Sequence, residues 1–354
     1  MNNYIGHENQ LYGVEEMRLV GGKGDGMRVL SVRTGGGLEF MVSLDRCADL
    51  VRVTFKGDNM GYFAPCGFVS PKYYDNVGAG FLKSFTAGFI TTCGLTAVGS
   101  PCTDDGEELP LHGTISNTPC ENHAYWVDGG NIHIKAVVRD AAMFGHHLML
   151  EREYVCPIGK NEIHMTDTVK NIGSKTSPFE LLYHCNMGYP LLSEKAELTI
   201  GSSEVAPRND HAATGIDSCL EVEVPQNGYE EMCFYHKLSG TANIKLYNPE
   251  ISKGVVMSYN TSELPFFTQW KMMGEREYVM GLEPGNCTPD GRAAMRESGK
   301  LKFLKPEEES TCTLNFELVI KPNICFFLSF ALTLFAFYLR RTLARVCLKG
   351  FVKI

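Results

Sequence analysis

Residues 131–138 read Asn-Ile-His-Ile-Lys-Ala-Val-Val, and every second residue from Ile132 to Val138 is apolar. Residues 163–169 repeat this alternation, with Ile163, Met165 and Val169 on one face and Asp167 between them on the same face. Because the side chains of a strand point alternately to its two faces, the pattern predicts strands with one face buried. Asp167 interrupts an apolar face, so we expect its carboxylate to accept hydrogen bonds inside the protein.

Further short strands are expected on both sides of these two runs. The triplet Gly35-Gly36-Gly37 separates residues 28–34 from residues 38–44, which is typical of a β-hairpin. Other apolar or alternating runs cover residues 243–248, 254–261, 278–283 and 311–320. No long stretch of residues 1–320 has the 3.6-residue period of a helix. The sequence therefore predicts an all-β fold, a large antiparallel sandwich that residues 1–320 form as one domain.

The charge of the chain argues against a nucleic-acid partner. The 354 residues include 33 Lys and Arg and 41 Asp and Glu, a net charge of −8. Six basic residues and no acidic residue fall in residues 320–354, so residues 1–319 carry 27 basic and 41 acidic side chains and a net charge of −14. A body this acidic would repel a phosphate backbone, and we expect no binding to nucleic acid.

The thirteen cysteines are predicted to be free thiols, most of them buried. Their number is odd, their spacing is irregular and no Cys-x-x-Cys pair occurs, so neither a disulfide framework nor a structural zinc site is indicated. Residues 1–10 are polar and lack the apolar segment of a secretion signal. Together these features predict a cytoplasmic protein. The oligomeric state stays open, because a paired and an exposed strand edge have the same sequence pattern.

Residues 321–354 differ from the rest of the chain. Within them, residues 324–339 (ICFFLSFALTLFAFYL) are sixteen uncharged and mostly apolar residues, followed by Arg340 and Arg341. As a helix they would span about 24 Å, slightly less than the ~30 Å hydrocarbon core of a membrane. Three interpretations stay open: a membrane anchor, a helix that is amphipathic or docks on the core, and a foreign extension from a shifted reading frame. Membrane association is expected only under the first.

Three segments place ionisable side chains among glycine, proline and aromatic residues. They are LHGTISNTP at residues 111–119, LLYHCNMGYPLL at residues 181–192 and GLEPGN at residues 281–286. Taken singly, each has an ordinary structural explanation, as a hydrogen-bonded histidine in a loop or a solvated glutamate at the end of a strand. Their joint presence in this order is more informative than any of them alone.

In this combination and order the segments resemble the aldose 1-epimerase, or galactose mutarotase-like, superfamily, and most closely its DUF4432 subgroup. FITTCGLTAVG at residues 89–99 and LPFFTQWKMMG at residues 264–274 fit the same subgroup. The resemblance covers residues 10–318. It implies a galactose mutarotase-like β-supersandwich with a sugar-binding cleft on one face. It further implies that His112 and His184 match the two histidines of the family, and that Glu283 matches its catalytic glutamate.

The sequence departs from the pattern of the family in two places. Thr114 stands where many relatives have an arginine after the His-Gly pair, which puts one contact to the sugar in doubt. Residues 321–354, with their atypical hydrophobic stretch, have no counterpart in the family.

The predicted chemistry is the interconversion of sugar anomers by ring opening. A base must take the proton of the anomeric hydroxyl while an acid protonates the ring oxygen, and the roles reverse on closure. We expect Glu283, ionised at pH 7, to be the base and His184 to be the acid, with His112 polarising the ring-oxygen side. The reaction needs no metal ion and no cofactor, and the sequence offers no convincing motif for either.

A monosaccharide or sugar derivative is the expected ligand, and four further residues are candidates for binding it. Trp270 is one of only two tryptophans and would stack on the apolar face of a sugar ring. Arg46 is a charge in a strand-like run and would need a partner, either Asp49 or the substrate. Asn186 and Lys271 are expected near the cleft because they fall within the family segments.

Two other functions are compatible with the same segments. The first is a non-catalytic carbohydrate-binding protein, which would need Trp270 but no matched acid and base. The second is another sugar epimerase or a lyase that removes a proton next to a carbonyl group with the same acid and base. Such enzymes often recruit a metal ion to stabilise an enolate, and the sequence contains no obvious set of metal ligands.

Overall fold

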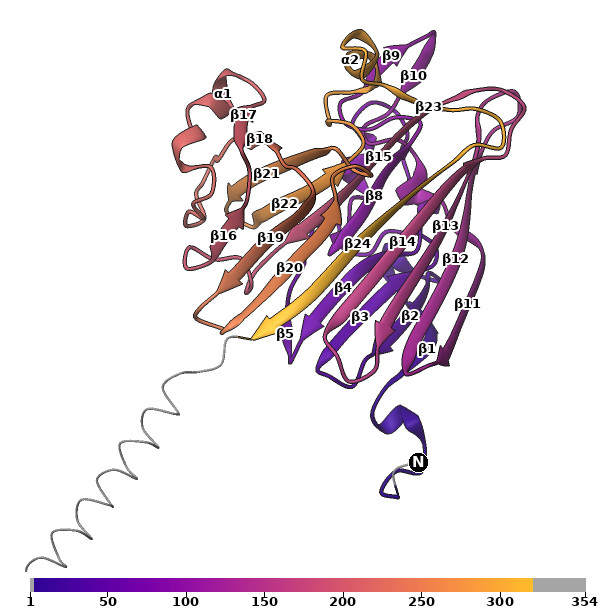
Figure 1. The fold of residues 1–354 in the computed structure, drawn as a ribbon, viewed down its shortest axis with the longest axis vertical. Helices are drawn as coiled ribbons and strands as arrows, with labels where there is room; N and C mark the ends of the chain where they lie inside the picture. The colour runs from indigo at the N-terminus through magenta and orange to yellow at the C-terminus, as the bar shows by residue number, and fades with distance from the viewer. Residues whose placement is uncertain (1–2, 321–354) are drawn as a thin grey trace, which may run out of the picture. The chain divides into compact units, whose positions relative to one another are not determined.

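A computed structural model describes residues 3–320 of the chain. These residues are mostly β-strand, and neighbouring strands of the large sheets run antiparallel, as predicted (Figure 1). The predicted tail, residues 321–354 with its apolar stretch 324–339, lies outside the described residues. Within residues 3–320, no helix is both long and apolar enough to cross a membrane.

The largest sheet has eight strands, which lie side by side across Figure 1. In spatial order they are β11 (Cys120–Asp128), β12 (Asn131–Ala141), β13 (His147–Pro157), β14 (Glu162–Asn171), β24 (Glu309–Ile320), β20 (Lys253–Asn260), β19 (Thr241–Asn248) and β16 (Glu197–Ile200). Residues on alternate positions of β12 and β14 are buried, which confirms the strands predicted at residues 131–138 and 163–169.

A second sheet has seven strands and carries most of the candidate site. Its order is β17 (Glu204–Pro207), β18 (Met232–Lys237), β21 (Phe266–Gly274), β22 (Glu277–Gly285), β15 (Ser177–Met187) and β23 (Lys302–Leu304), and β8 (Ile90–Leu95) also pairs with β15. Seven of the nine residues of β22 and ten of the eleven of β15 are buried. Strands that are buried over most of their length imply that other chain segments cover both faces of the sheet.

A third sheet of five strands completes the sandwich. It consists of β1 (Gly13–Arg18), β2 (Arg28–Arg33), β3 (Leu38–Ser43), β4 (Asp49–Phe55) and β5 (Asp58–Asn59). Strands β2 and β3 form the hairpin predicted around Gly35-Gly36-Gly37. Two small pairs are β6 (Tyr62–Phe63) with β7 (Ala87–Gly88) and β9 (Cys102–Asp104) with β10 (Glu107–Leu109). The two α-helices of the described residues, α1 (Asp210–Ala213) and α2 (Arg292–Glu297), are short.

A buried arginine joins the three sheets at the centre of the core. Arg152 on β13 donates to both carboxylate oxygens of Asp167 on β14, at 2.8 and 2.6 Å. It also donates to Asp49 on β4 at 2.7 Å and to the hydroxyl of Thr92 on β8 at 2.8 Å. Tyr183 on β15 donates to Asp167 as well, at 2.7 Å. Asp167 is therefore a buried structural acceptor, as its place in the sequence pattern predicted.

The cysteines of the described residues behave as predicted. All eleven of them are free, and nine of these are buried. Burial raises the pKa of the buried thiols, for example that of Cys156 to about 12, which lowers their reactivity and is typical of packing residues.

Candidate active site

Four neighbouring strands of the seven-stranded sheet bring the candidate residues together. The pairs Cys185↔Leu282 and Leu182↔Gly285 place His184 on β15 directly opposite Glu283 on β22. Trp270 on β21 pairs with Gly281, two residues before Glu283, and Cys233 on β18 pairs with Trp270. Because residues two apart in a strand share a face, His184, Glu283, Trp270 and Cys233 all project from the same side of the sheet.

A glycine beside Glu283 leaves room for its carboxyl group. A Cβ atom at Gly281 would collide with Oε1 of Glu283 and would lie 3.0 Å from the Cβ atom of Trp270. Any larger residue at this position would displace the glutamate or the tryptophan. There is thus a steric reason for a glycine at position 281, in the GLEPGN segment, and the sequence alone did not reveal it.

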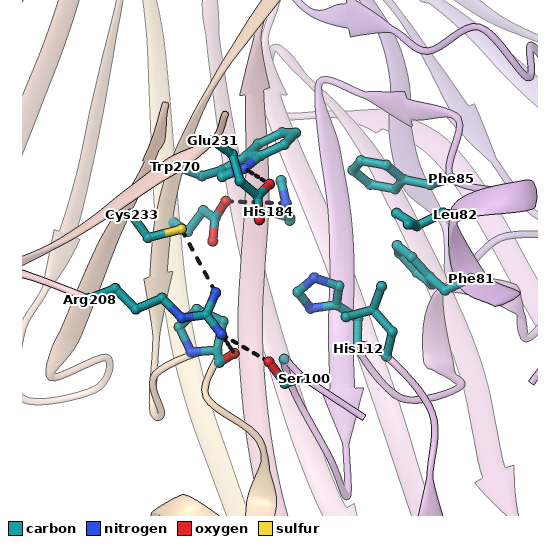
Figure 2. Close-up of a pocket in the computed structure, with 14 residues that line it drawn as sticks. Phe81, Leu82, Phe85, Ser100, His112, His184, Arg208, Glu231, Cys233 and Trp270 are labelled. Atoms are coloured by element: carbon teal, nitrogen blue, oxygen red, sulfur yellow. Dashed lines mark hydrogen bonds and ion pairs between the residues drawn. The ribbon is translucent and has the colours of Figure 1, made fainter. Parts of the chain in front are cut away.

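These side chains line a pocket of about 220 Å³ (Figure 2). Other walls of the pocket come from loops and from the residue before β18, Glu231. The pocket therefore combines aromatic, acidic and cationic groups. The lining residues are Phe81, Leu82, Phe85, Gly99, Ser100, Leu111, His112, His184, Arg208, Glu231, Cys233, Trp270, Glu283 and Pro289. The structure therefore brings four predicted residues, His112, His184, Trp270 and Glu283, into one pocket.

Three polar atoms of the pocket are buried without a hydrogen-bond partner among the described residues: Nδ1 of His112, Nδ1 of His184 and Oε1 of Glu283. Oε1 of Glu283 lies 3.2 Å from Nε2 of His184, but this contact does not have the geometry of a hydrogen bond. Unsatisfied buried polar atoms are rare in proteins and cost free energy. Three of them in one pocket indicate a site built to receive a polar ligand.

Burial favours the uncharged forms of the facing pair. It raises the pKa of Glu283 well above its usual range, and the nearby Glu231 carboxylate adds to this shift, whereas Arg208 opposes it. Burial also lowers the pKa of His184 to about 3, assisted by His112. This shift opposes the expected ionisation of Glu283, because a charged carboxylate there would lose its hydration without gaining a hydrogen-bonded partner.

His112 comes from a loop whose backbone is fixed on both sides. Its N–H donates to the carbonyl of Gly99 at 3.0 Å, and its carbonyl accepts from the N–H of Gly94 at 3.1 Å. The residue has a positive φ of 59°, which is unusual for a side chain with a Cβ atom. The imidazole ring lies 5.6 Å from the ring of His184. Burial and the positive charge of Arg208 lower the pKa of His112 to about 4.

Arg208 is a pocket residue that the sequence analysis missed. It follows β17, and its guanidinium group lies across the pocket from His112 in Figure 2. Its Nη2 donates to Ser100 at 2.9 Å and to the carbonyl of Pro289 at 3.3 Å, and its Nε lies 3.2 Å from Asp290. The sequence around Arg208 contains no pattern that indicates a site, so only the fold reveals it.

Aromatic rings form the opposite end of the pocket. The ring of His184 lies 5.1 Å from those of Phe85 and Trp270, in edge-to-face arrangements. The indole N–H of Trp270 donates to Oε2 of Glu231 at 2.6 Å. Glu231, also missed from the sequence, therefore fixes the orientation of the tryptophan from an exposed position on the rim.

Two of the predicted binding residues are not brought to the pocket. Lys271 follows Trp270 on the strand and so projects to the other face, where its Nζ lies 2.7 Å from Glu223 and donates to the carbonyl of Ser218. Arg46 is buried and donates to the carbonyl of Val69 at 3.1 Å. Its expected partner Asp49 is hydrogen-bonded to Arg152 instead.

Asn186 and Thr114 lie close to the pocket without lining it. Asn186 shares the face of His184, and its amide donates to the carbonyls of Ala87 and His184 at 3.2 and 2.8 Å. Its Oδ1 is buried without a hydrogen-bond partner among the described residues. Thr114 donates to Asp140 at 3.3 Å, so it does not take over the sugar contact expected of an arginine at this position.

No cluster of three or more His, Cys, Asp or Glu side chains with the geometry of a metal site occurs in residues 3–320. The pocket itself offers two histidines and a glutamate, but the latter keeps its proton more tightly than an ordinary carboxylate, as its raised pKa indicates.

Comparison with known proteins identifies a family for this geometry. The sequence profile of a domain of unknown function, DUF4432, matches residues 24–318. Among solved structures, a proposed aldose 1-epimerase from Klebsiella pneumoniae superposes with a TM-score of 0.83 at 26% sequence identity. The match covers 89% of this chain and 86% of the Klebsiella protein.

More distant structures share the fold. A galactose 1-epimerase from Lactobacillus acidophilus has a TM-score of 0.60 at 14% identity, covering 87% of this chain and 99% of that protein. A galactose mutarotase-like protein from Clostridium acetobutylicum has a TM-score of 0.65 at 14% identity, covering 88% of this chain and 100% of that protein. These similarities confirm the predicted galactose mutarotase-like fold. No curated protein sequence matches the chain.

Proposed function

This chain belongs to the DUF4432 family, and from that premise we propose that its pocket opens and recloses the ring of an aldose, as an aldose 1-epimerase does. The observation that carries the proposal is the pair of Glu283 and His184, held face to face at 3.2 Å between Trp270 and His112. One proton donor and one proton acceptor at this distance can serve the two oxygens of a hemiacetal carbon.

The proton balance of ring opening fits the uncharged pair. One member of the pair takes the proton of the anomeric hydroxyl, the other gives its proton to the ring oxygen, and the C1–O5 bond breaks to leave a free aldehyde. After rotation about the C1–C2 bond, the reverse transfers close the ring in the other configuration. The pair holds one transferable proton whether Glu283 or His184 carries it, so the cycle needs no proton from solvent.

A polar and an aromatic part of the pocket support binding of a sugar. We propose that Trp270 and Phe85 contact apolar C–H surfaces of the ring, while Arg208 donates to its hydroxyl groups. His112 would donate to or accept from the ring-oxygen side, since its Nδ1 is buried without a hydrogen-bond partner among the described residues.

The test is the rate of exchange between anomers, measured by NMR saturation transfer at the anomeric proton for a panel of neutral, deoxy and acidic aldoses. We expect the protein to raise the exchange rate of at least one of them above its spontaneous value. Binding of sugars without any rise in exchange would instead identify a non-catalytic carbohydrate-binding protein. No response from any sugar would contradict both functions.

The uncharged pair predicts a broad pH plateau. Because the pKa of His184 is lowered to about 3 and that of Glu283 is raised, the pair should keep its single proton over a wider pH interval than ordinary pKa values allow. We therefore expect kcat/KM to stay level from about pH 5 to pH 8. With ordinary pKa values, of about 4.3 for Glu and about 6.5 for His, the acid would lose its proton within this range. A tenfold fall in kcat/KM per pH unit above about pH 6.5 would contradict the uncharged pair.

Arg208 is predicted to contribute to affinity more than to turnover. A hydrogen bond from a charged group contributes about 1.5–3 kcal/mol, so Arg208→Met should raise KM by roughly ten- to a hundredfold. Arg208→Lys should have an intermediate effect, because it keeps the charge but loses the planar set of donors. Arg139→Met, at an exposed arginine on β12, is the matched control. An unchanged KM in Arg208→Met would exclude Arg208 from sugar binding.

A further inference from the structure

A second pocket, of about 440 Å³, adjoins the candidate active site and shares four of its walls. The shared residues are Leu82, Phe85, Glu231 and Trp270. Its other walls are mostly apolar and come from strands β6, β21 and β22 and from the segment after β6; among them are Tyr62, Ala64, Met272 and Val279. Nothing in the proposed ring opening uses these residues.

Two of the shared residues, Leu82 and Glu231, lie at the open side of the active-site pocket. Glu283 and His184 are only 2% and 5% exposed, whereas Leu82 is 59% exposed and Glu231 is also exposed. In Figure 2 Trp270 and Glu231 lie next to His184, Phe85 and Leu82 lie on the right side of the site, and Arg208 and Ser100 lie below. A sugar whose anomeric carbon reaches Glu283 and His184 therefore enters with that carbon first. Its outer edge then lies beside Leu82 and Glu231, while Trp270 and Phe85 flank His184 and separate the two pockets.

The aromatic side chains between and within the two pockets are held in place. The indole of Trp270 is fixed by its hydrogen bond to Glu231, at 2.6 Å. The hydroxyl of Tyr62 donates to the carbonyl of Arg276 at 3.3 Å. Rings that are already ordered lose little entropy when a ligand stacks on them, which favours binding of flat apolar surfaces. Around these rings, the carboxylates of Glu231 and Glu277 can accept hydrogen bonds from hydroxyl groups.

The sizes of the pockets point to a ligand longer than one ring. Sites for small molecules usually enclose roughly 300–1,000 Å³. The active-site pocket, with about 220 Å³, is below this range, and the adjoining pocket of about 440 Å³ brings the combined cleft into it. Apolar faces bordered by hydroxyl acceptors are the surface that a second sugar ring requires.

We propose that this second pocket is a subsite for a second sugar unit, so that the preferred substrate is a glycosylated aldose whose own anomeric hydroxyl is free. The inference rests on the proposed function, because that function decides which end of the sugar is buried. The second unit is joined to a hydroxyl of the first ring other than the anomeric one. It stacks between Tyr62 and Trp270 while Glu231 accepts from its hydroxyl groups.

The test compares each reducing disaccharide with the monosaccharide at its reducing end. Glucose is measured against maltose, cellobiose and lactose, and anomer exchange is followed by NMR at the reducing end only. Burial of about 50 Å² of apolar ring surface corresponds to roughly a tenfold gain in affinity. We expect at least one disaccharide to have a KM roughly tenfold below that of glucose.

Variants of the second pocket test its role in binding independently of the active-site pocket. Tyr62→Ala should remove the advantage of the disaccharide and leave the exchange of glucose unchanged, since Tyr62 does not line the active-site pocket. Tyr62→Phe, which keeps the ring, should retain most of the advantage and shows that a loss in Tyr62→Ala is not misfolding. Tyr125→Ala, at an exposed tyrosine on β11, is the matched control and should have no effect.

Binding is measured in parallel by tryptophan fluorescence in a Trp126→Phe background, where Trp270 is the remaining tryptophan. If glucose is exchanged but no disaccharide is preferred and Tyr62→Ala has no effect, the subsite is overturned and the proposed function stands. If disaccharides bind in a Tyr62-dependent manner without any exchange, the subsite stands and the proposed catalysis fails. If no sugar binds or exchanges, both are overturned.

Discussion

The Glu283→Gln variant should lose about 10²- to 10⁴-fold in the rate of anomer exchange and bind the sugar with nearly unchanged affinity. A side-chain amide has the shape of the carboxyl group but cannot transfer its proton to His184 or to the ring oxygen. The fold should tolerate the change, because burial raises the pKa of Glu283 and so favours its uncharged form, which glutamine resembles. Glutamine also fits the space that Gly281 leaves.

The measurements are anomer exchange by NMR and sugar affinity by tryptophan fluorescence, with thermal unfolding as the check on folding. Glu317→Gln, at an exposed glutamate on β24, is the matched control and should behave like the unchanged protein. Wild-type exchange in Glu283→Gln would remove Glu283 from the reaction. Loss of affinity together with exchange would assign it to binding alone.

The Arg152→Leu variant should be destabilised by about 3–5 kcal/mol, the usual cost of removing one partner from a buried ion pair. Its guanidinium group is the partner of both Asp49 and Asp167, and all three side chains are buried. Without it, two carboxylates remain in the core with uncharged donors only: the hydroxyl and backbone N–H of Thr92 for Asp49, and the hydroxyl of Tyr183 for Asp167. Because these residues come from β4, β14, β8 and β15, the loss should loosen the packing between the sheets.

Urea unfolding gives the free energy of unfolding, and Arg139→Leu is the matched control. Arg139 is also an arginine beside a carboxylate, 3.1 Å from Glu121, but this pair is nearly half exposed. An exposed pair contributes only about 0–1 kcal/mol, so the control should unfold almost like the unchanged protein. Equal effects of the two substitutions would mean that the buried network does not stabilise the core.

Local pattern was sufficient to predict the strands. The alternation in residues 131–138 and 163–169 and the glycines at 35–37 each report on a few neighbouring residues, and β12, β14 and the β2–β3 hairpin formed as expected. The pairing order could not be predicted in this way. Strand β24, for example, inserts between β14 and β20, which are far apart in the sequence. Such contacts depend on the packing of the whole core.

In the candidate site too, some residues could be predicted from local sequence and others only from the fold. His112, His184 and Glu283 were found because they stand in distinctive segments, and the structure places all three in one pocket. Lys271 was misplaced although the rule that decides its side is simple: it follows Trp270 on a strand and so faces away. Arg208 and Glu231 are joined to the site only by the fold. The raised pKa of Glu283 could not be predicted either, because burial in the pocket is a property of the folded protein.

The most direct test of the account is to follow an aldose with the unchanged protein in D₂O by NMR, observing the protons at C1 and C2 together. Ring opening predicts faster exchange between the α and β anomers while the proton at C2 stays in place, since no C–H bond breaks. Replacement of the C2 proton by deuterium would show proton abstraction next to the carbonyl and a different reaction. Spontaneous exchange rates for every sugar, with C2 intact, would contradict the proposed catalysis.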